Sequence, residues 1–277
     1  MNELHAPQKV LLGPGPSTVH PRVLQALANP VMGHLDPAFF QVMDDVCEML
    51  REVFHTTNSM TLPISSTGTG AMETACANII EPGDEVLICR NGYFGIRLAD
   101  IAERCGATVH VMDTPWGKAV DAQMLRDEIK QYPGLKAVGV VHAETSTGVL
   151  SDMKELVEVI HEAGALAFID AVHYAPHRLI DVTDWDCDFL VCSAYKFFGP
   201  HVGVMYGRRE LLENLAPYKL RPAPDDLPGR WMTGTQNHEG IMGAMAAVDY
   251  LASLSPNVAN RRKALRQSMA AIETYEN

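Results

Sequence analysis

The 277-residue chain has little of what marks a nucleic-acid-binding, membrane or secreted protein. It carries 22 Lys and Arg against 34 Asp and Glu, a net charge of −12, and no stripe of basic residues interleaved with aromatic ones. This balance argues against nucleic-acid partners. No uninterrupted apolar run approaches the ~20 residues needed to span a bilayer. Residues 1–5 lack the basic and then apolar character of a secretion signal. We therefore predict a cytoplasmic protein without nucleic-acid or membrane partners.

Disulfide and metal chemistry are also poorly represented. The six cysteines form no Cys-x-x-Cys pair and mostly lie in apolar segments: Cys47, Cys76, Cys89, Cys105, Cys187 and Cys192. We expect reduced, buried thiols, as in a cytosolic protein. Acids cluster at Asp181, Asp184, Asp186 and Asp188 without an accompanying histidine cluster. We expect a solvated loop there and no metal site.

The apolar residues predict an α/β fold. Seven strand-like runs recur, several of them continuously apolar: Met60–Ser65, Glu85–Cys89, Thr108–Met112, Ala137–His142, Leu166–Ala171, Phe189–Ser193 and Val202–Tyr206. Continuous apolar runs are typical of strands buried on both faces. Segments with helical spacing fill the gaps: residues 40–54, Ala71–Ile80, Ile96–Cys105, Ala122–Gln131 and Lys154–Ala163. Alternation of strands and helices predicts a mostly parallel sheet with helices on both faces.

Two further features bear on topology and domain organisation. The link Phe197–His201 is too short for a parallel crossover, so we expect the last strand to run antiparallel to the preceding one. After Pro224 the chain is rich in Gly and Asn and then becomes helical near residues 241–251, and a basic helical pattern follows Pro256. We predict an N-terminal arm over residues 1–20, a large domain over 21–255, and the start of a further unit over 256–277.

Three chemical features occur at the ends of predicted strands. Lys196 follows one apolar strand in the run Ser193–His201, and Asp170 ends another. The turn Thr67–Gly70 joins a third strand to a helix, and glycines there present backbone N–H groups where an anion is favoured. A lysine for a Schiff base, a carboxylate for a pyridine nitrogen and an anion-binding turn are what pyridoxal 5′-phosphate (PLP) needs from a protein.

Each feature alone has an ordinary structural alternative. The Gly/Thr turn also fits a simple helix cap, and it lacks the Gly-Lys-Ser/Thr ending of a P-loop. Asp170 could cap a helix or a turn, and Lys196 could extend to solvent along the surface. A lysine in an apolar site, however, has a lowered pKa and can act as a nucleophile. The combination of the three favours a PLP site.

Two histidines also follow apolar strands. His142 begins the polar run His142–Gly148, and His173 lies three residues after Asp170. Polar residues at the carboxyl ends of strands are where open α/β sheets bind ligands. Both remain candidates for ligand contact, although a lone histidine is more often a structural group.

Taken together, these motifs resemble the class V aminotransferases among the fold-type-I PLP enzymes. The first half is similar to alanine–glyoxylate and serine–pyruvate aminotransferases in four segments: Leu12–Ser17, Gly33–Pro37, Thr67–Glu73 and His142–Gly148. From about Asp170 the chain is more similar to cysteine desulfurase-like proteins, in three segments: Asp170–His177, the Lys196 run and Gly234–Asn237. The resemblance spans residues 11–255. It implies the fold-type-I large domain, a mixed, mostly parallel seven-stranded sheet sandwiched by helices.

The resemblance also implies roles for individual residues. Lys196 would hold PLP as an internal aldimine, and Asp170 would pair with the pyridine nitrogen. The residues that would bind the phosphate come from two segments: Thr67, Gly68, Thr69 and Ser193.

Four more residues match family positions around the cofactor ring and the subunit interface. Phe94 would stack on the ring, Thr145 would lie near its phenolic oxygen, and His173 would lie beside that oxygen. Thr235 resembles a residue that reaches the neighbouring subunit's phosphate, which implies a homodimer.

The implied activity is transfer of an amino group between a small amino acid, of the alanine or serine type, and a small 2-oxo acid, of the glyoxylate or pyruvate type. A cysteine desulfurase or related β-lyase, and a non-catalytic PLP-fold protein, are the alternatives. Family members carry the arginine that binds the substrate carboxylate, and the desulfurase cysteine, in a small C-terminal domain, and neither can be assigned here. Arg221 and Arg230 are candidates to replace that arginine.

Overall fold

The computed structural model describes residues 7, 9–232 and 234–277. Its core is a seven-stranded sheet in the order β1-β9-β8-β7-β4-β2-β3. The strands are β1 Thr61–Ile64, β2 Glu85–Arg90, β3 Thr108–Asp113, β4 Ala137–Val141, β7 Leu166–Asp170, β8 Phe189–Ser193 and β9 Gly203–Gly207. All seven predicted strands are confirmed.

The sheet is parallel except at one strand. The neighbouring strands from β3 to β8 pair in parallel, whereas β9 pairs antiparallel with both β8 and β1. The short link after β8 therefore reverses the chain as predicted. Because parallel strands share one carboxyl edge, the residues that follow β2, β4, β7 and β8 are brought to the same side of the molecule.

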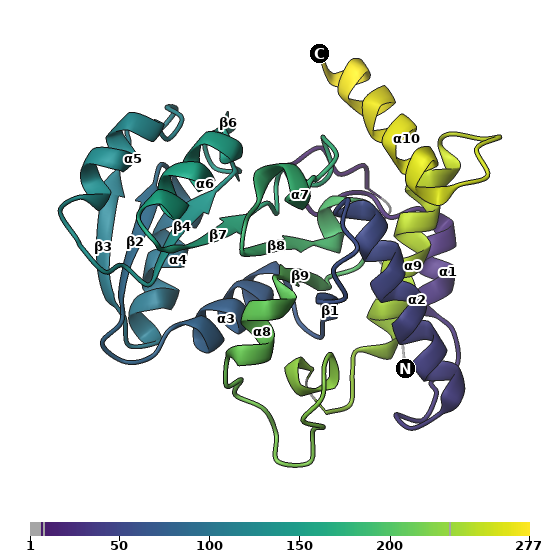
Figure 1. Ribbon diagram of the computed structural model, residues 1–277. Helices are drawn as coiled ribbons and strands as arrows, with labels where there is room; N and C mark the ends of the chain where they lie inside the picture. The colour runs from purple at the N-terminus through teal and green to yellow at the C-terminus, as the bar shows by residue number, and fades with distance from the viewer. Residues whose placement is uncertain (1–6, 8, 233) are drawn as a thin grey trace.

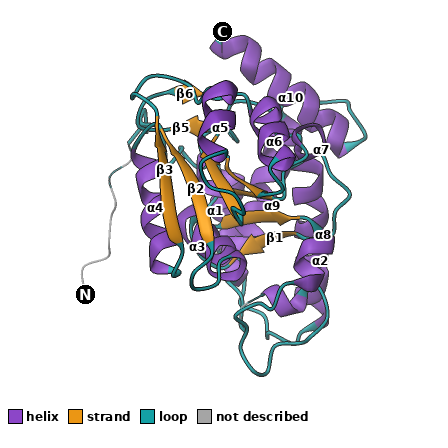
Figure 2. Ribbon diagram, turned by 60° about the vertical axis from the view of Figure 1, so that its left-hand side comes forward, coloured by secondary structure: helices purple, strands orange, loops and turns teal. Residues whose placement is uncertain are grey.

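Helices cover both faces of the sheet. On one face α3 (Gly68–Ile79) contacts β8 and β9, and α4 (Tyr93–Arg104) contacts β2, β3 and β4. On the other lie α5 (Ala122–Ile129), α6 (Met153–Glu162) and α7 (Val182–Trp185), with α6 against β7. Figure 2 shows α4 and α5 on opposite sides of the sheet. This double cover explains why β4 and β8 are buried at every position.

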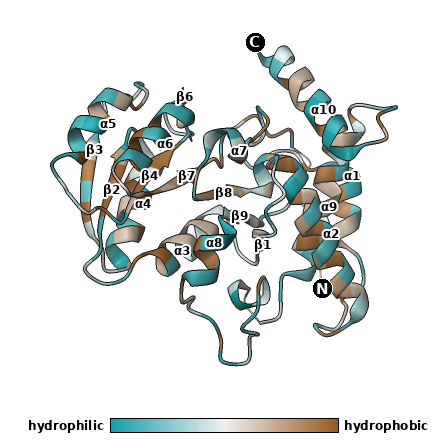
Figure 3. Ribbon diagram, viewed as in Figure 1, coloured by the Kyte–Doolittle hydropathy of each residue, from teal (hydrophilic) through white to brown (hydrophobic). Residues whose placement is uncertain are grey.

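Four helices form a cluster beyond the β1 edge, as Figure 1 shows: α1 Pro21–Leu27, α2 Pro37–Val53, α9 His238–Ser253 and α10 Arg261–Glu276. Asp36 starts α2, because its side chain accepts a hydrogen bond from the N–H of Ala38 and Pro37 occupies the first turn. The apolar α9 packs against the other three helices, whereas α10 is largely hydrophilic along its length (Figure 3). Segments distant in sequence thus enclose one edge of the sheet.

The sequence-based boundaries were too late at several helix starts, and two of these bear on the site. Helices α3 and α4 begin three residues earlier than predicted, at Gly68 and Tyr93. The predicted phosphate turn therefore forms the first turn of α3 and is not a loop before it. The short elements β5 (Ala143–Glu144), β6 (Val149–Leu150), α8 (Arg209–Asn214), α1 and α7 were not predicted.

The predicted solvated acidic loop is confirmed in part, since Asp184 and Asp186 are exposed, but it was wrong about the backbone and about Asp188. Residues 182–185 form α7, and Asp181 caps it by accepting a hydrogen bond from the N–H of Asp184. Asp188 is buried and pairs with His161 and Arg208, which compensates for the loss of its hydration. The acids thus serve the fold. Across residues 9–232 and 234–277, no group of His, Cys, Asp and Glu is arranged to hold a metal ion.

The burial predicted for the cysteines is confirmed at five of the six positions. All six are free thiols, and five are buried, Cys105 being half-buried. Burial raises the pKa of Cys47, Cys76 and Cys89 to about 12, so these thiols remain protonated and unreactive. Among the helices in the described part of the chain, none has the length and apolarity to cross a membrane.

Candidate active site at the carboxyl edge of the sheet

Three predicted site residues come from adjacent strands at the carboxyl edge of the sheet. Asp170 is the last residue of β7, and Ser193 is the last residue of β8, its direct neighbour. Lys196 follows in a 3₁₀ turn, Ala194–Lys196. His173 lies in the turn after β7, and its pKa is lowered to about 4 by burial and by the nearby Lys196 charge. One polar cluster therefore contains a lysine, a carboxylate, a hydroxyl and an imidazole.

Asp170 is a buried acid with an incomplete set of partners. Its side chain is 2% exposed, and Oδ1 accepts a hydrogen bond from the Val172 N–H at 2.8 Å. No residue in the described ranges donates a hydrogen bond to Oδ2. Burial raises the pKa of Asp170 to about 6, while the Val172 N–H and the Lys196 charge act in the opposite direction. A cation facing Oδ2 would offset the cost of keeping this carboxylate charged.

Lys196 is equally enclosed. It is 5% exposed, and its Nζ donates a hydrogen bond to the carbonyl oxygen of Pro14. Burial lowers its pKa, and the charge of Asp170 opposes that shift. A lysine with a lowered pKa supplies more neutral amine at physiological pH, which is the form that acts as a nucleophile.

The first turn of α3 packs against this cluster. A Cβ on Gly68 would lie 3.0 Å from Ser193 Cβ and 3.3 Å from Val172 Cγ2, so only glycine lets the helix approach this closely. Thr67 is the N-cap and makes no side-chain capping bond. The first N–H groups of α3, together with the hydroxyls of Thr67, Thr69 and Ser193, form a site suited to an anion.

Helix α4 adds an aromatic ring and a cation. Arg97 donates from Nη1 to Thr69 Oγ1 at 3.1 Å, and its guanidinium lies 5.0 Å from the centre of the Phe94 ring. Glu144 is buried and accepts hydrogen bonds from the N–H groups of Phe94 and Gly95, which fixes the first turn of α4. Arg97 has no carboxylate within salt-bridge distance in the described ranges, so its positive charge is available to a ligand anion.

Arg97 was missed by sequence reasoning. The available signal was its position three residues after Phe94, which places both side chains on one face of a helix. Because the predicted helix began at Ile96, Phe94 was placed before the helix and the spacing was not read. The position of the Arg97 charge beside Phe94 was therefore found from the structure and not from the sequence.

The remaining predicted residues lie in different places. Thr145 is half-buried directly after Glu144. His142 is buried between Tyr174 and Trp185, with Nδ1 at 2.8 Å from the Ser151 carbonyl oxygen, and burial lowers its pKa to about 4. It thus belongs to the packing behind the site. Thr235 is exposed.

Neither arginine considered for the substrate carboxylate is placed for that role. Arg230 donates from Nη2 to the carbonyl oxygens of Leu212, Glu213 and Leu215, which holds the segment after α8. Arg221 is exposed. The loop around Thr235 is instead held by Ser65, whose hydroxyl donates to Gln236 Oε1 and accepts from the Asn237 N–H.

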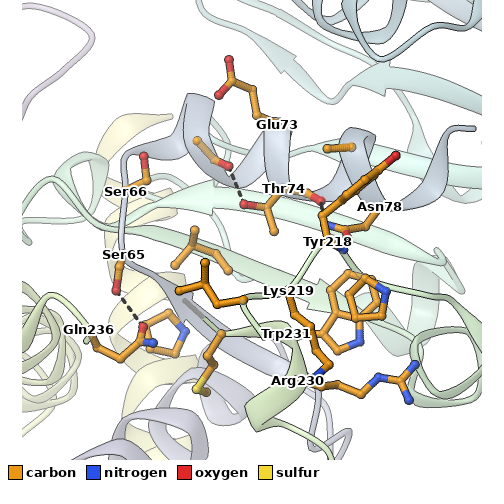
Figure 4. A pocket seen from close by; sticks show the side chains of 17 residues that line it. Ser65, Ser66, Glu73, Thr74, Asn78, Tyr218, Lys219, Arg230, Trp231 and Gln236 are labelled. Carbon is orange, nitrogen blue, oxygen red and sulfur yellow. Dashed lines mark hydrogen bonds between the residues drawn. The ribbon is translucent and has the colours of Figure 1, made fainter. Parts of the chain in front are cut away.

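A cavity of about 480 Å³ lies on the other side of the α3 turn (Figure 4). Its lining residues come from β1, α3 and residues 217–236: among them are Ser65, Ser66, Glu73, Asn78, Lys219 and Arg230. Lys196, Asp170 and Ser193 do not line this cavity.

The residues at the sheet edge fit PLP. The pyridine nitrogen, when protonated, would supply the donor that Asp170 Oδ2 lacks. The N–H groups of the α3 turn would donate hydrogen bonds to the phosphate. Phe94 provides a ring beside these groups, and Lys196 provides the amine. Asp170 Oδ2 lacks a donor and Arg97 lacks an acid partner within the described ranges, so a ligand would complete the environment of both.

Comparison with known proteins identifies the family. Residues 10–275 match the family model described as aminotransferase class-V. The chain is 40% identical over 194 residues to (S)-ureidoglycine–glyoxylate transaminase of Bacillus subtilis, covering 70% of this chain and 46% of that protein. It is 41% identical over 201 residues to alanine–glyoxylate aminotransferase of Rattus norvegicus, covering 73% and 48%. These matches span about half the length of the curated relatives.

A solved structure agrees with these matches. The crystal structure of alanine–glyoxylate aminotransferase from Nostoc sp. superimposes with a TM-score of 0.83 at 33% identity. The match covers 95% of this chain and 72% of that chain. The large-domain fold is therefore shared over nearly the whole chain.

Proposed function

The chain belongs to the class-V aminotransferase family, and we propose that it acts as a PLP-dependent aminotransferase. Its reaction would move an amino group between a small amino acid, of the alanine or serine type, and a small 2-oxo acid, of the glyoxylate or pyruvate type. Support for these substrates comes from the names of the B. subtilis and R. norvegicus relatives, both of which act on glyoxylate.

The observation that carries the proposal is the pairing of two buried groups, Lys196 and Asp170, at the carboxyl edge of the sheet. Each perturbs the other's pKa, and each is otherwise costly to bury. Perturbed titratable groups that converge in this way are typical of catalytic sites. If the two groups formed only a structural ion pair, Asp170 Oδ2 would accept a hydrogen bond from within the protein.

The chain's residues divide the work in PLP chemistry. When bound, PLP withdraws electrons from the substrate Cα. Asp170 would keep the pyridine nitrogen protonated through its charge, and Lys196 Nζ would bond covalently to the cofactor at rest and carry a proton to and from the substrate Cα.

The other residues would orient the cofactor. The phosphate would be held by four residues of the α3 turn and β8: Thr67, Gly68, Thr69 and Ser193. Phe94 would stack on the ring, Thr145 and His173 would lie beside the phenolic oxygen, and Arg97 would add positive charge near the phosphate turn through Thr69.

We further propose a homodimer, because Thr235 lies exposed beside an apolar cavity of about 620 Å³ that also contains the exposed Leu35 and Phe40. Its role would be to reach the phosphate of the neighbouring subunit. A cytoplasmic location is supported by the six free thiols. The division into a large domain over 21–255 and a further unit from 256 stays a prediction.

A spectroscopic half-reaction tests the function. The protein is loaded with PLP and mixed in a single turnover with alanine, serine, glycine or cysteine, and the visible absorbance band is followed. Loss of that band with alanine or serine, and its return on addition of glyoxylate or pyruvate, is the expected result.

Two outcomes would contradict the proposal. Release of sulfide or alanine from cysteine without reversal by an oxo acid would identify a desulfurase or β-lyase. A stable visible band that no amino acid alters would identify a protein that binds PLP without catalysis.

A further inference from the structure

The segment Gly13–Ser17 lies directly against Lys196. Gly15 has φ +137°, and a Cβ at this position would lie 2.7 Å from Lys196 Cδ and 2.9 Å from both Cε and Nζ. The adjacent carbonyl oxygen, that of Pro14, accepts the hydrogen bond from Lys196 Nζ. The backbone of this segment therefore covers the end of the lysine and provides its hydrogen-bond acceptor.

Ser17 fastens the same segment to the lysine's own turn. Its N–H and its hydroxyl both donate to the Tyr195 carbonyl oxygen, at 3.0 and 2.7 Å. Its Oγ also accepts a hydrogen bond from the Phe198 N–H at 2.9 Å. The partners of Ser17 thus flank Lys196 on both sides.

The outer face of the segment is open to solvent. Pro14 and Pro16 are exposed, whereas Gly15 and Ser17 point inward and are half-buried. The preceding residues Leu11 and Leu12 are exposed as well. In the described part of the chain, the hydrogen bonds of the segment are those of Pro14 and Ser17, so the hydroxyl of Ser17 has a large share in closing it over the lysine.

We propose that Gly13–Ser17 is a strap that positions the amine of Lys196. In this arrangement the Pro14 carbonyl oxygen accepts a hydrogen bond from the Lys196 amine whenever the amine is not bonded to the cofactor. Ser17 is a positioning residue that keeps the strap closed. The inference rests on the proposed function for its catalytic meaning, since an aminotransferase releases this amine during each half-reaction.

The strap would also govern access of water to the amine. The titratable groups that face Lys196 are Asp170, His173 and the Tyr195 ring, which lies 5.7 Å from Nζ. The strap itself contributes no titratable side chain between Gly13 and Ser17. Opening it would hydrate the amine without changing the charges around it.

Competitive acetylation of the full chain, freed of PLP, tests the strap. Acetic anhydride is applied over a pH series, and mass spectrometry gives the limiting rate constant and the pKa of Lys196, with the exposed Lys130 and Lys154 as internal references. Ser17→Ala is expected to raise the limiting rate constant about tenfold, equivalent to about 1.4 kcal/mol. That size is expected when a hydroxyl with two hydrogen bonds is removed and local opening becomes more frequent.

Two variants make the test specific. Ser17→Thr keeps the hydroxyl and should restore the slow rate. Thr18→Ala is the matched control, because among the described residues Thr18 Oγ1 accepts a hydrogen bond from the Leu11 N–H and makes none with the lysine turn. Gly15→Ala should also speed labelling, since its Cβ would collide with the lysine stem.

A Ser17→Ala rate equal to the wild-type rate, or matched by Thr18→Ala, would overturn the proposal. Circular dichroism and thermal unfolding confirm that each variant is folded. The labelling uses protein without PLP, so it can fail while PLP still binds and reacts with amino acids. Conversely, absence of the half-reaction would refute the proposed function and leave the labelling result intact.

Discussion

The two sides of the first turn of α3 differ in how their charged groups are paired. On the side of Figure 4, the cavity contains Lys219 and Arg230, but both are engaged by the protein itself. Lys219 binds the Ala223 carbonyl oxygen and Asp225, and Arg230 binds three carbonyl oxygens after α8. These cations serve the fold, although the buried Nε of Arg230 has no hydrogen-bond partner in the described ranges.

On the other side the pairing of the charged groups is incomplete. Lys196 and Asp170 are buried with shifted pKa values, and Arg97 holds Thr69 with no acid partner in the described ranges. The difference teaches that burial of an underpartnered charge locates chemistry better than the size of a cavity does. The energetic reason is that such a charge is costly unless a ligand completes its environment.

The largest expected effect contrasts two lysines. Lys196→Ala should lower the rate of the amino-transfer half-reaction by at least ~10³-fold, about 4 kcal/mol in barrier, because the amine proposed to carry the proton to and from the substrate Cα is removed. Lys219→Ala, on the cavity side, should leave the rate within about twofold. Stopped-flow absorbance with alanine measures the rate in both variants. Equal losses of rate would show that the two sides of the turn do not differ in function.

A second contrast uses two acids. Asp170→Asn is nearly isosteric and should slow the half-reaction by ~10²-fold or more, since the pyridine nitrogen would lose the charge that keeps it protonated. Glu73 lines the cavity, so Glu73→Gln is the control and should leave the rate of the half-reaction unchanged. If Asp170→Asn retains activity within about tenfold, the carboxylate has another role.

The pH dependence of the free energy of unfolding tests whether burial raises the pKa of Asp170. The ordinary carboxyl pKa of 3.8 is raised to about 6 in the folded protein. Between these values the folded form keeps a proton that the unfolded form releases, so the free energy of unfolding falls as pH rises from about 4 to about 6. Without PLP, this contribution lowers stability by up to about 3 kcal/mol at neutral pH.

Urea unfolding of the wild type and of Asp170→Asn across this window checks the sign. His142 and His173 are present in both proteins, so their own titration cancels in the difference. The advantage of the Asn variant should grow from pH 4 to pH 6 and then level off. A difference that is constant with pH would show that Asp170 titrates normally.

The smallest effect separates two arginines. Arg97→Met should weaken PLP binding about tenfold, about 1.4 kcal/mol, through loss of a charge near the phosphate turn. Arg230→Met should instead destabilise the fold by about 1–3 kcal/mol, because three carbonyl oxygens lose their donor. Fluorescence titration with PLP and thermal unfolding distinguish them, and the reverse pattern would place the anion site in the cavity.

Much of this arrangement could be predicted from the sequence. The continuous apolar runs predicted the strands, and the short link after Ser193 predicted that β9 is antiparallel. Asp170 and Lys196 were recognised because each polar group follows an apolar strand directly. Such signals are local, and burial on both faces makes them strong.

The missed features depend on contacts between distant segments. The sequence does not indicate that Glu144 caps α4, because 49 residues separate it from Gly95. The earlier start of α4, and with it the alignment of Phe94 and Arg97, follows from that cap. Likewise, the contact of Pro14 with Lys196 joins residues 182 positions apart. These long-range pairs are fixed by tertiary packing and leave no periodic pattern.

Borohydride reduction of the PLP-loaded protein tests the central claim most directly. Reduction fixes the cofactor to the lysine that binds it, and peptide mass spectrometry identifies that lysine. The account predicts modification at Lys196, with Lys219 in the neighbouring cavity unmodified. Attachment of the cofactor to Lys219, or to any lysine other than Lys196, would contradict it.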